Sequence, residues 1–144
     1  GVDLPGEATG LFNLNQEIDL AVYSFGQNFS VSPLQLITAV SAVANGGTLL
    51  EPYIVKEVLD QNGNVIESTD RTEVRQVISK ETSDTMRELL ESVVTVGTGK
   101  NAYTAGYRVA GKTGTTEKIA EQLQEGRELR IASFVAFANK KLTF

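Results

Sequence analysis

Residues 111–115 read Gly-Lys-Thr-Gly-Thr, a short run that places a lysine and two hydroxyls among glycines. The alternating residues Tyr107-Arg108-Val109-Ala110 lead into this run, so we predict that it lies on a β-strand. A Lys-Thr-Gly box on a strand points to acyl transfer through a serine. The same stretch contains Gly106-x-x-x-x-Gly111-Lys112-Thr113, which matches the phosphate-binding loop of nucleotide-binding proteins. The functional interpretation depends on which of these two chemistries the run serves.

The residues around the run disfavour nucleotide binding. A phosphate-binding loop needs a buried strand that ends at its first glycine and a helix that begins at Lys-Thr. Residues 97–104 are instead polar and turn-like, and Gly114-Thr115-Thr116 is a poor start for a helix. The four residues inside the pattern include no glycine, although such a loop must turn backbone amides toward phosphate. Nucleotide binding is therefore kept as the less favoured hypothesis.

Composition excludes several other kinds of chemistry. The chain has 144 residues and 41% hydrophobic content, which fits one soluble globular domain. It contains no cysteine and no histidine, which removes thiol chemistry, the usual zinc site and a Ser-His-Asp triad. A net charge of −5 argues against nucleic acid as a partner, and no apolar run is long enough to span a membrane. We predict neither a metal nor an organic cofactor.

Several blocks of sequence surround the Lys-Thr-Gly run in a distinctive order. They are Ser24-Phe25-Gly26-Gln27, Val31-Ser32-Pro33-Leu34-Gln35-Leu36, Ala44-Asn45-Gly46-Gly47, the segment 93–102 with its Gly97-Thr98-Gly99, and Ile131-Ala132-Ser133-Phe134-Val135. Their order and spacing resemble the second half of the transpeptidase domain of class B penicillin-binding proteins. The resemblance extends from about residue 1 to residue 137. It implies an α+β fold, with helices packed on a small antiparallel sheet, that is part of the penicillin-binding-protein and β-lactamase type of transpeptidase fold.

The chain also departs from that family. The family carries a Ser-x-x-Lys nucleophile box and a Ser-x-Asn box upstream of this region. No serine here has a lysine three residues later or an asparagine two residues later. The tail, residues 138–144, stops where the family continues into a further strand and a closing helix. We therefore expect residues 1–144 to form a single partial transpeptidase domain that is inactive alone.

The resemblance implies a function for the parent protein. It would be a serine-type peptidoglycan D,D-transpeptidase that cross-links stem peptides through an acyl-enzyme and is inhibited by β-lactams. It would act on the extracytoplasmic face of the bacterial cell membrane, held there by an N-terminal anchor outside this chain. A non-catalytic module of similar fold, which binds a cell-wall peptide or a partner protein, is the alternative.

The resemblance also assigns roles to individual residues, because the family places its Lys-Thr-Gly strand at a sheet edge beside the active serine. Lys112 would supply positive charge, and the hydroxyls of Thr113 and Thr115 would bind the terminal carboxylate of the substrate. Gly114 would let an extended substrate approach closely. The Thr115 backbone N–H would be one of two oxyanion donors. Gln27 is a further, weaker candidate for lining the cleft.

Caps and periodicity predict two helices. Ser32 as N-cap, Pro33 at the first helical position and Gln35 in a capping box begin a helix that ends at residues 45–47. It is apolar nearly all round, which predicts a central, buried helix. Ser79 caps a second helix over residues 80–95, whose apolar stripe consists of Met86, Leu89, Leu90, Val93 and Val94. Residues 18–23 form a short ordered segment of either type, and residues 1–16 are irregular.

Short strands are predicted around turn signals. Asn62-Gly63 indicates a hairpin between residues 53–59 and 64–67, and residues 74–78 form another short strand. Residues 107–115 and 129–138 are expected to pair, with the charged residues 116–128 forming a mobile loop between them. Strand 129–138 is largely apolar on both faces, so an open edge on it predicts self-association between chains.

Overall fold

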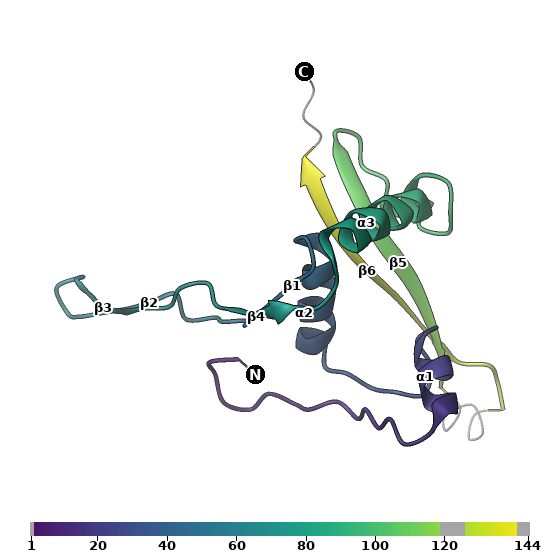
Figure 1. Cartoon of the computed structure of the whole chain (residues 1–144), viewed down its shortest axis with the longest axis horizontal. Coiled ribbons are helices and arrows are strands. Elements are labelled where there is room, and N and C mark those ends of the chain that lie inside the picture. The colour runs from purple at the N-terminus through teal and green to yellow at the C-terminus, as the bar shows by residue number, and fades with distance from the viewer. Residues whose placement is uncertain (1, 119–125, 141–144) are drawn as a thin grey trace. The chain divides into compact units, whose positions relative to one another are not determined.

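A computed structural model describes residues 2–118 and 126–140 (Figure 1). The chain forms two compact units, the first made of Gly1–Ala42 and Thr48–Val77 and the second of Val43–Gly47 and Ile78–Phe144. The described elements are α1 (Glu17–Tyr23), α2 (Pro33–Ala44), β1 (Thr48–Leu50), β2 (Glu57–Leu59), β3 (Val65–Ser68), β4 (Glu73–Gln76), α3 (Lys80–Thr95), the 3-10 helix η1 (Lys100–Ala102), β5 (Tyr107–Glu117) and β6 (Arg130–Lys140). The predicted α+β class is confirmed. The described strands pair two by two, as β1–β4, β2–β3 and β5–β6, rather than forming one sheet.

Helix α2 of the first unit begins with the predicted capping box. The Ser32 hydroxyl accepts from the Gln35 backbone N–H at 3.1 Å, and the Gln35 Oε1 accepts from the Ser32 backbone N–H at 2.8 Å. These bonds satisfy amides that a helix start leaves without partners. The helix ends at Ala44, and Gly46 and Gly47 follow with φ of 95° each, a conformation that glycine adopts without steric cost.

The predicted burial of α2 is wrong. Ala42 is the buried residue of this helix, whereas Leu36 and Ile37 are 43% and 45% exposed. The described strands of the first unit are only three or four residues long. Such short segments present too little surface to cover a helix that is apolar all round, so part of its apolar surface stays exposed.

The predicted hairpin forms between β2 and β3 and is held by one carboxylate. Asp60 accepts from the backbone N–H groups of Asn62 and Asn64, each at 2.8 Å, and from the Asn64 side-chain amide. These bonds lower the pKa of Asp60, since they favour its charged form. Gly63 adopts φ 86° in the turn, as the Asn-Gly signal requires.

Two other parts of the first unit differ in detail from the expectation. The segment 18–23 proves to be helical, as α1. The strand predicted over residues 74–78 is β4, and it pairs antiparallel with β1, an element that the sequence analysis did not predict. Leu49 lies opposite Arg75 in this pair. At three residues, β1 is too short to show the alternation from which strands are recognised.

Helix α3 of the second unit has the predicted bounds. The Ser79 hydroxyl caps it by accepting from the Thr82 backbone N–H at 3.2 Å. Val94, from the predicted apolar stripe, is 1% exposed, whereas Leu89 of the same stripe is 56% exposed. Ser83 is fully buried, and its hydroxyl donates to the Val43 carbonyl at 2.6 Å, which ties α3 to the segment 43–47.

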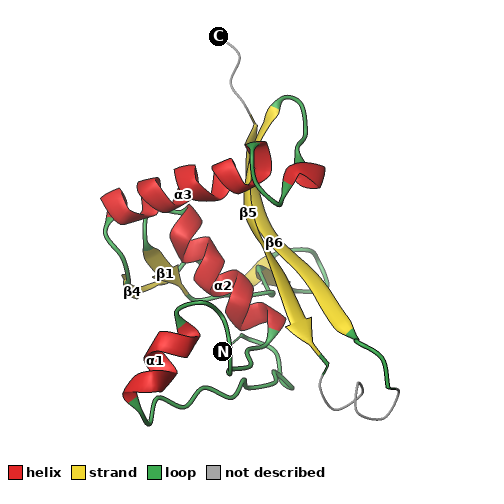
Figure 2. Cartoon of the chain, turned by 90° about the vertical axis from the view of Figure 1, so that its right-hand side faces the viewer, coloured by secondary structure: helices red, strands yellow, loops and turns green. Residues whose placement is uncertain are grey.

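Strands β5 and β6 form an antiparallel ladder from Tyr107↔Lys140 to Glu117↔Arg130, and α3 packs against β5 (Figures 1 and 2). The predicted pairing is confirmed, but Thr116 and Glu117, predicted in the loop, extend β5. Residues 119–125 of that loop lie outside the described residues. Gly111 is buried in the ladder, where a Cβ would lie 2.7 Å from Phe134 Cζ, 2.7 Å from the Val135 carbonyl oxygen and 2.8 Å from Ala136 Cβ.

Gly111→Ala should therefore destabilise the chain by about 1–3 kcal/mol, as overpacking does in a close-packed site. Gly114→Ala is the matched control, because its Cβ would meet only the Ser133 hydroxyl, at 2.6 Å, and a side chain can rotate away. Urea unfolding followed by circular dichroism compares the two variants. Equal midpoints would show that Gly111 is not needed for packing.

The outer edge of β6 should promote self-association. Among the described strands, β6 pairs only with β5, and its Ile131 and Phe134 are 48% and 42% exposed. An unpaired, apolar edge can add a strand from a second chain. We expect dimers or larger species in size exclusion coupled to light scattering, and Val135→Lys should reduce them by placing a charge on this strand. A monomer at high concentration would contradict the expectation.

Candidate functional site

The Lys-Thr-Gly run lies in the middle of β5, as predicted from its alternation. Lys112 is exposed, and its Nζ donates to the Thr113 carbonyl at 2.8 Å. Successive side chains of a strand point to opposite faces, so Lys112 and Gly114 share one face and Thr113 and Thr115 share the other. A ligand that lay on one face of the sheet would meet only half of these groups. A ligand that lay along the edge of β5 would be next to both faces.

The two threonines of the run have different surroundings. The Thr113 hydroxyl forms a hydrogen bond with the Thr98 hydroxyl at 3.1 Å, and Thr98 comes from the segment that follows α3. Thr115 is exposed, and its hydroxyl has no partner within the described ranges. The Thr115 hydroxyl is therefore available to a ligand, while that of Thr113 is already oriented by a neighbour.

Gly114 carries no side chain on the face that Lys112 shares. It lies opposite Ser133 of β6, whose hydroxyl would be 2.6 Å from a Cβ at position 114. A side chain here would displace the Ser133 hydroxyl and cover the backbone of β5. The glycine thus keeps the strand accessible to another chain that approaches closely.

One edge of β5 remains available for pairing. Within residues 2–118 and 126–140, β5 is paired with β6 alone. In an antiparallel pair, alternate residues direct their N–H and C=O groups away from the partner strand. An extended peptide could occupy this edge by forming main-chain hydrogen bonds.

An ion pair fixes β5 to α3 near the start of the strand. The Arg108 Nε lies 3.1 and 3.0 Å from the two carboxylate oxygens of Glu91, and its Nη2 also donates to Glu91. Hydrogen bonding to Glu91 and its negative charge raise the pKa of Arg108. The pair helps to hold β5 in place, but Arg108 is largely exposed and the contribution to stability is small.

The remaining predicted site residue, Gln27, lies in the first unit. It follows Gly26, which has φ 84°, and its backbone N–H donates to the Val22 carbonyl at 3.2 Å. The residues of β5 belong to the second unit, so Gln27 and the Lys-Thr-Gly run lie in different units. Its place in the cleft stays a prediction.

Sequence reasoning did not single out two residues that the structure places at the site. Thr98 and Ser133 stand in two of the sequence blocks that surround the Lys-Thr-Gly run, and neither is a predicted site residue. Thr98 now contacts Thr113, and Ser133 lies across from Gly114. The Gly97-Thr98-Gly99 motif was a visible signal for the first. The second depends on the β5–β6 register, which no local pattern specifies when the connection is long.

The backbone of residues 106–117 lacks the geometry of a phosphate-binding loop. Gly106 precedes a continuous strand, and Gly111, Lys112 and Thr113 all lie within it. No helix begins at Lys112-Thr113, where the loop of a nucleotide-binding protein would direct its amides toward phosphate. This geometry removes the basis of the nucleotide-binding hypothesis.

The described residues contain no group of three or more acidic, cysteine or histidine side chains placed to hold a metal ion. None of their helices is long and apolar enough to cross a bilayer.

Comparison with known proteins identifies the family. The model of the family "Penicillin binding protein transpeptidase domain" matches residues 1–144. Stage V sporulation protein D of Bacillus subtilis (strain 168) is 47% identical over 145 residues, which cover 96% of this chain and 22% of that protein. The Peptidoglycan D,D-transpeptidase FtsI homolog of Mesostigma viride is 34% identical over 83% of this chain and 22% of its own length.

Solved structures agree with this result. Penicillin binding protein 3 of Mycobacterium tuberculosis, complexed with ampicillin, superposes with a TM-score of 0.79 at 32% identity, over 96% of this chain and 33% of that one. A putative peptidoglycan glycosyltransferase from Atopobium parvulum gives a TM-score of 0.73 at 33% identity, over 96% of this chain and 32% of that one. The chain belongs to the penicillin-binding protein transpeptidase family. It spans about a fifth of the length of the curated relatives that it matches.

Proposed function

We propose that this chain is the Lys-Thr-Gly part of a serine-type peptidoglycan D,D-transpeptidase. The observation that carries the proposal is the exposed Lys112-Thr113-Gly114-Thr115 run on β5, beside a strand edge that is open within the described residues. Membership of the transpeptidase family supports it, and so does the name of the Mesostigma viride relative. The substrate would be a peptidoglycan stem peptide, and β-lactams would compete for the same strand. The protein would act on the extracytoplasmic face of the bacterial cell membrane.

The run suits a substrate that adds to the edge of β5 as an extended strand. Main-chain hydrogen bonds from β5 would hold the peptide, and Gly114 would let it lie close. The Thr115 hydroxyl, which has no partner in the described ranges, would donate to the terminal carboxylate of the stem peptide. Thr113, oriented by Thr98, would provide a second hydroxyl.

Lys112 and the Thr115 backbone would serve the chemical step. The positive charge of Lys112 would attract the anionic end of the substrate and help to keep the groups around the serine in their reactive protonation states. The Thr115 N–H would donate to the oxyanion of the tetrahedral intermediate, where one such donor lowers the barrier by about 3–4 kcal/mol. The serine would attack the D-Ala-D-Ala carbonyl, D-Ala would leave, and an amine of a second stem peptide would release the acyl group.

The nucleophile has to come from outside this chain, because none of its serines stands in a Ser-x-x-Lys box. Residues 1–144 would then be one part of a transpeptidase domain that is inactive alone. The same absence favours one alternative, a non-catalytic module that binds cell-wall peptide or a partner protein through β5. A full-length reading frame with a Ser-x-x-Lys box upstream would decide for the enzyme.

The isolated chain should form no covalent adduct with penicillin. A serine without an adjacent base is a weak nucleophile at neutral pH, and no adjacent lysine is in place here. Intact-mass spectrometry after incubation with a β-lactam measures this directly, with the full-length protein as positive control. A stoichiometric mass increase that maps to a serine of this chain would disprove the assignment of the nucleophile to another segment.

In the full-length protein, Thr115→Val should slow acylation by penicillin about 10-fold or more. Valine is close to threonine in shape but lacks the hydroxyl, and a hydrogen bond to a charged group contributes about 1.5–3 kcal/mol. Thr116→Val is the matched control, because this neighbouring threonine is also exposed and lies on the other face of β5. Stopped-flow acylation rates distinguish the two. Equal rates in both variants would leave Thr115 with a backbone role only.

A further inference from the structure

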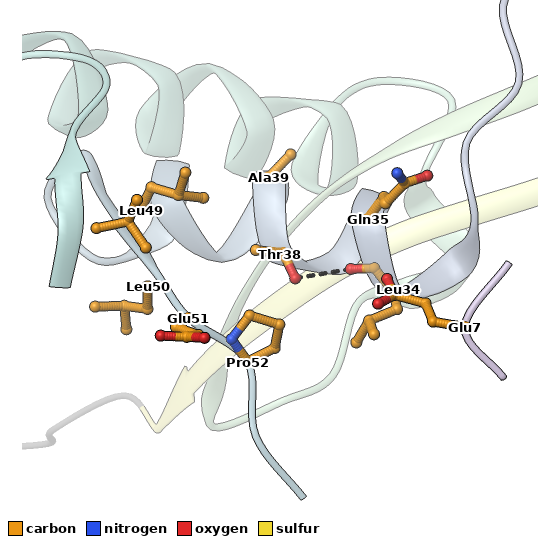
Figure 3. Close-up of a pocket in the computed structure, with 10 residues that line it drawn as sticks. Glu7, Leu34, Gln35, Thr38, Ala39, Leu49, Leu50, Glu51 and Pro52 are labelled. Atoms are coloured by element: carbon orange, nitrogen blue, oxygen red, sulfur yellow. Dashed lines mark hydrogen bonds between the residues drawn. The ribbon is translucent and has the colours of Figure 1, made fainter. Parts of the chain in front are cut away.

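A cavity of about 520 Å³ lies in the first unit (Figure 3). Its walls come from α2, from β1 with the two residues that follow it, and from β4 and the N-terminal segment. The lining residues are Glu7, Leu34, Gln35, Thr38, Ala39, Leu49, Leu50, Glu51, Pro52 and Val74. This volume is within the range of small-molecule binding sites, and none of these residues belongs to the transpeptidase machinery proposed above.

Hydrogen bonds fix the elements that form the walls of the cavity. The capping box of Ser32 and Gln35 fixes the start of α2, and the pairing of β1 with β4 fixes the opposite wall. The Glu51 backbone N–H donates to the Thr72 carbonyl at 3.0 Å, which continues this pairing beyond β1. Thr38 directs its hydroxyl to the Leu34 carbonyl at 2.8 Å, so this polar group is already satisfied within the helix.

The N-terminal segment is attached on both sides of the cavity. The Asp3 carboxylate accepts from the backbone N–H groups of Ile54 and Val55, each at 2.8 Å. Seven residues later, the Gly10 backbone N–H donates to Gln35 Oε1 at 3.2 Å. Gly10 has no room for a side chain, since a Cβ would lie 2.2 Å from the Ser30 carbonyl oxygen. Glu7 lies between these two attachments and lines the cavity.

The lining combines hydrocarbon with negative charge. Leu34, Leu49, Leu50, Pro52 and Val74 provide an apolar interior, whereas Glu7 and Glu51 provide carboxylates. The Glu51 side chain makes no ion pair within the described residues, and no lysine or arginine lines the cavity. A ligand that fills this space must therefore be apolar over most of its surface and is favoured by a positive charge at one end.

We propose that this cavity binds a small organic cation with a hydrocarbon body, of the alkylammonium class. The alkyl chain would lie between α2 and β1, against Leu34 and Leu50. The ammonium group would remain at the Glu51 side, where it stays partly hydrated while it neutralises the carboxylate. The site is independent of the serine chemistry proposed for β5, because neither Lys112 nor Thr115 takes part in it.

Titration of the 144-residue chain with n-octylamine, followed by two-dimensional amide NMR, tests the proposal. At neutral pH the amine is protonated, and we expect saturable shifts centred on Thr38, Ala39 and Leu50. n-Octanol tests the alkyl chain alone and should bind more weakly, while octanoate should bind weakest because its charge is repelled. Equal affinities for the amine and octanoate, or shifts that do not centre on the cavity, would overturn the proposal.

Separate variants measure how much the Glu51 charge and the apolar lining each contribute to ligand binding. Glu51→Gln should weaken octylamine binding about threefold, which is what an exposed ion pair contributes, and should leave octanol unchanged. Glu67→Gln, an exposed carboxylate on the hairpin, is the control and should change neither. Equal effects of these two variants would show a nonspecific response to net charge and would disprove the role of Glu51.

Filling the cavity should abolish binding of all the ligands. Ala39→Leu adds a larger side chain to the lining of α2, whereas Ser41→Leu places the same side chain on an exposed position of that helix outside the cavity. We expect Ala39→Leu to remove the octylamine and octanol shifts, and Ser41→Leu to retain them. Retention of binding in Ala39→Leu, with unchanged circular dichroism, would place the ligand elsewhere.

Discussion

The β5–β6 ladder is the constraint on which the rest of the site depends. Its register sets Gly111 against Ala136 and Gly114 against Ser133. A shift by one residue would turn every side chain of β5 to the opposite face, which would move Lys112 to the side that Thr113 now occupies. The contacts of β5 with α3 and with the segment after it hold this arrangement, through the Arg108–Glu91 ion pair and the Thr98–Thr113 hydrogen bond. The two glycines differ in their surroundings: a Cβ at Gly111 would meet Phe134, Val135 and Ala136, whereas a Cβ at Gly114 would meet only the Ser133 hydroxyl.

The first unit achieves its order mainly through side chains that bond to backbone groups. Large buried side chains are few in the described part of the molecule, so apolar burial contributes little to this unit. Asp3, Gln35 and Asp60 each accept from two or more backbone N–H groups. The pKa of Asp3 is lowered by the Ile54 and Val55 N–H groups, and the pKa of Asp60 is lowered first by the Asn64 side-chain amide and then by backbone N–H groups, because these donors favour the charged carboxylates. Polar contacts of this kind specify geometry where packing is sparse, and they give the cavity between α2 and β1 its defined walls.

The parts of the fold that follow local rules could be predicted from sequence. Helix α3 and its Ser79 cap, the capping box of α2 and the Asn-Gly hairpin all depend on residues within four positions of one another. The parts that could not be predicted depend on distant partners. Strand β1 forms because Leu49 pairs with Arg75, which lies far along the chain. Leu36 is exposed because the short strands of the first unit do not cover helix α2. The Lys-Thr-Gly residues were visible as a motif, but the contact of Thr98 with Thr113 and the position of Ser133 required the register.

The geometry of β5 would also explain how one strand could contribute to the proposed acyl transfer without supplying the nucleophile. Lys112 and Thr115 point to opposite faces, so a substrate can reach both only if it lies along the edge between them. At the edge, the backbone of β5 would bind an extended substrate by its main chain, which would place a carbonyl at a fixed distance from a serine set beside the strand. Under the proposed function, positioning and charge would be properties of β5, whereas bond formation would belong to a group on another segment.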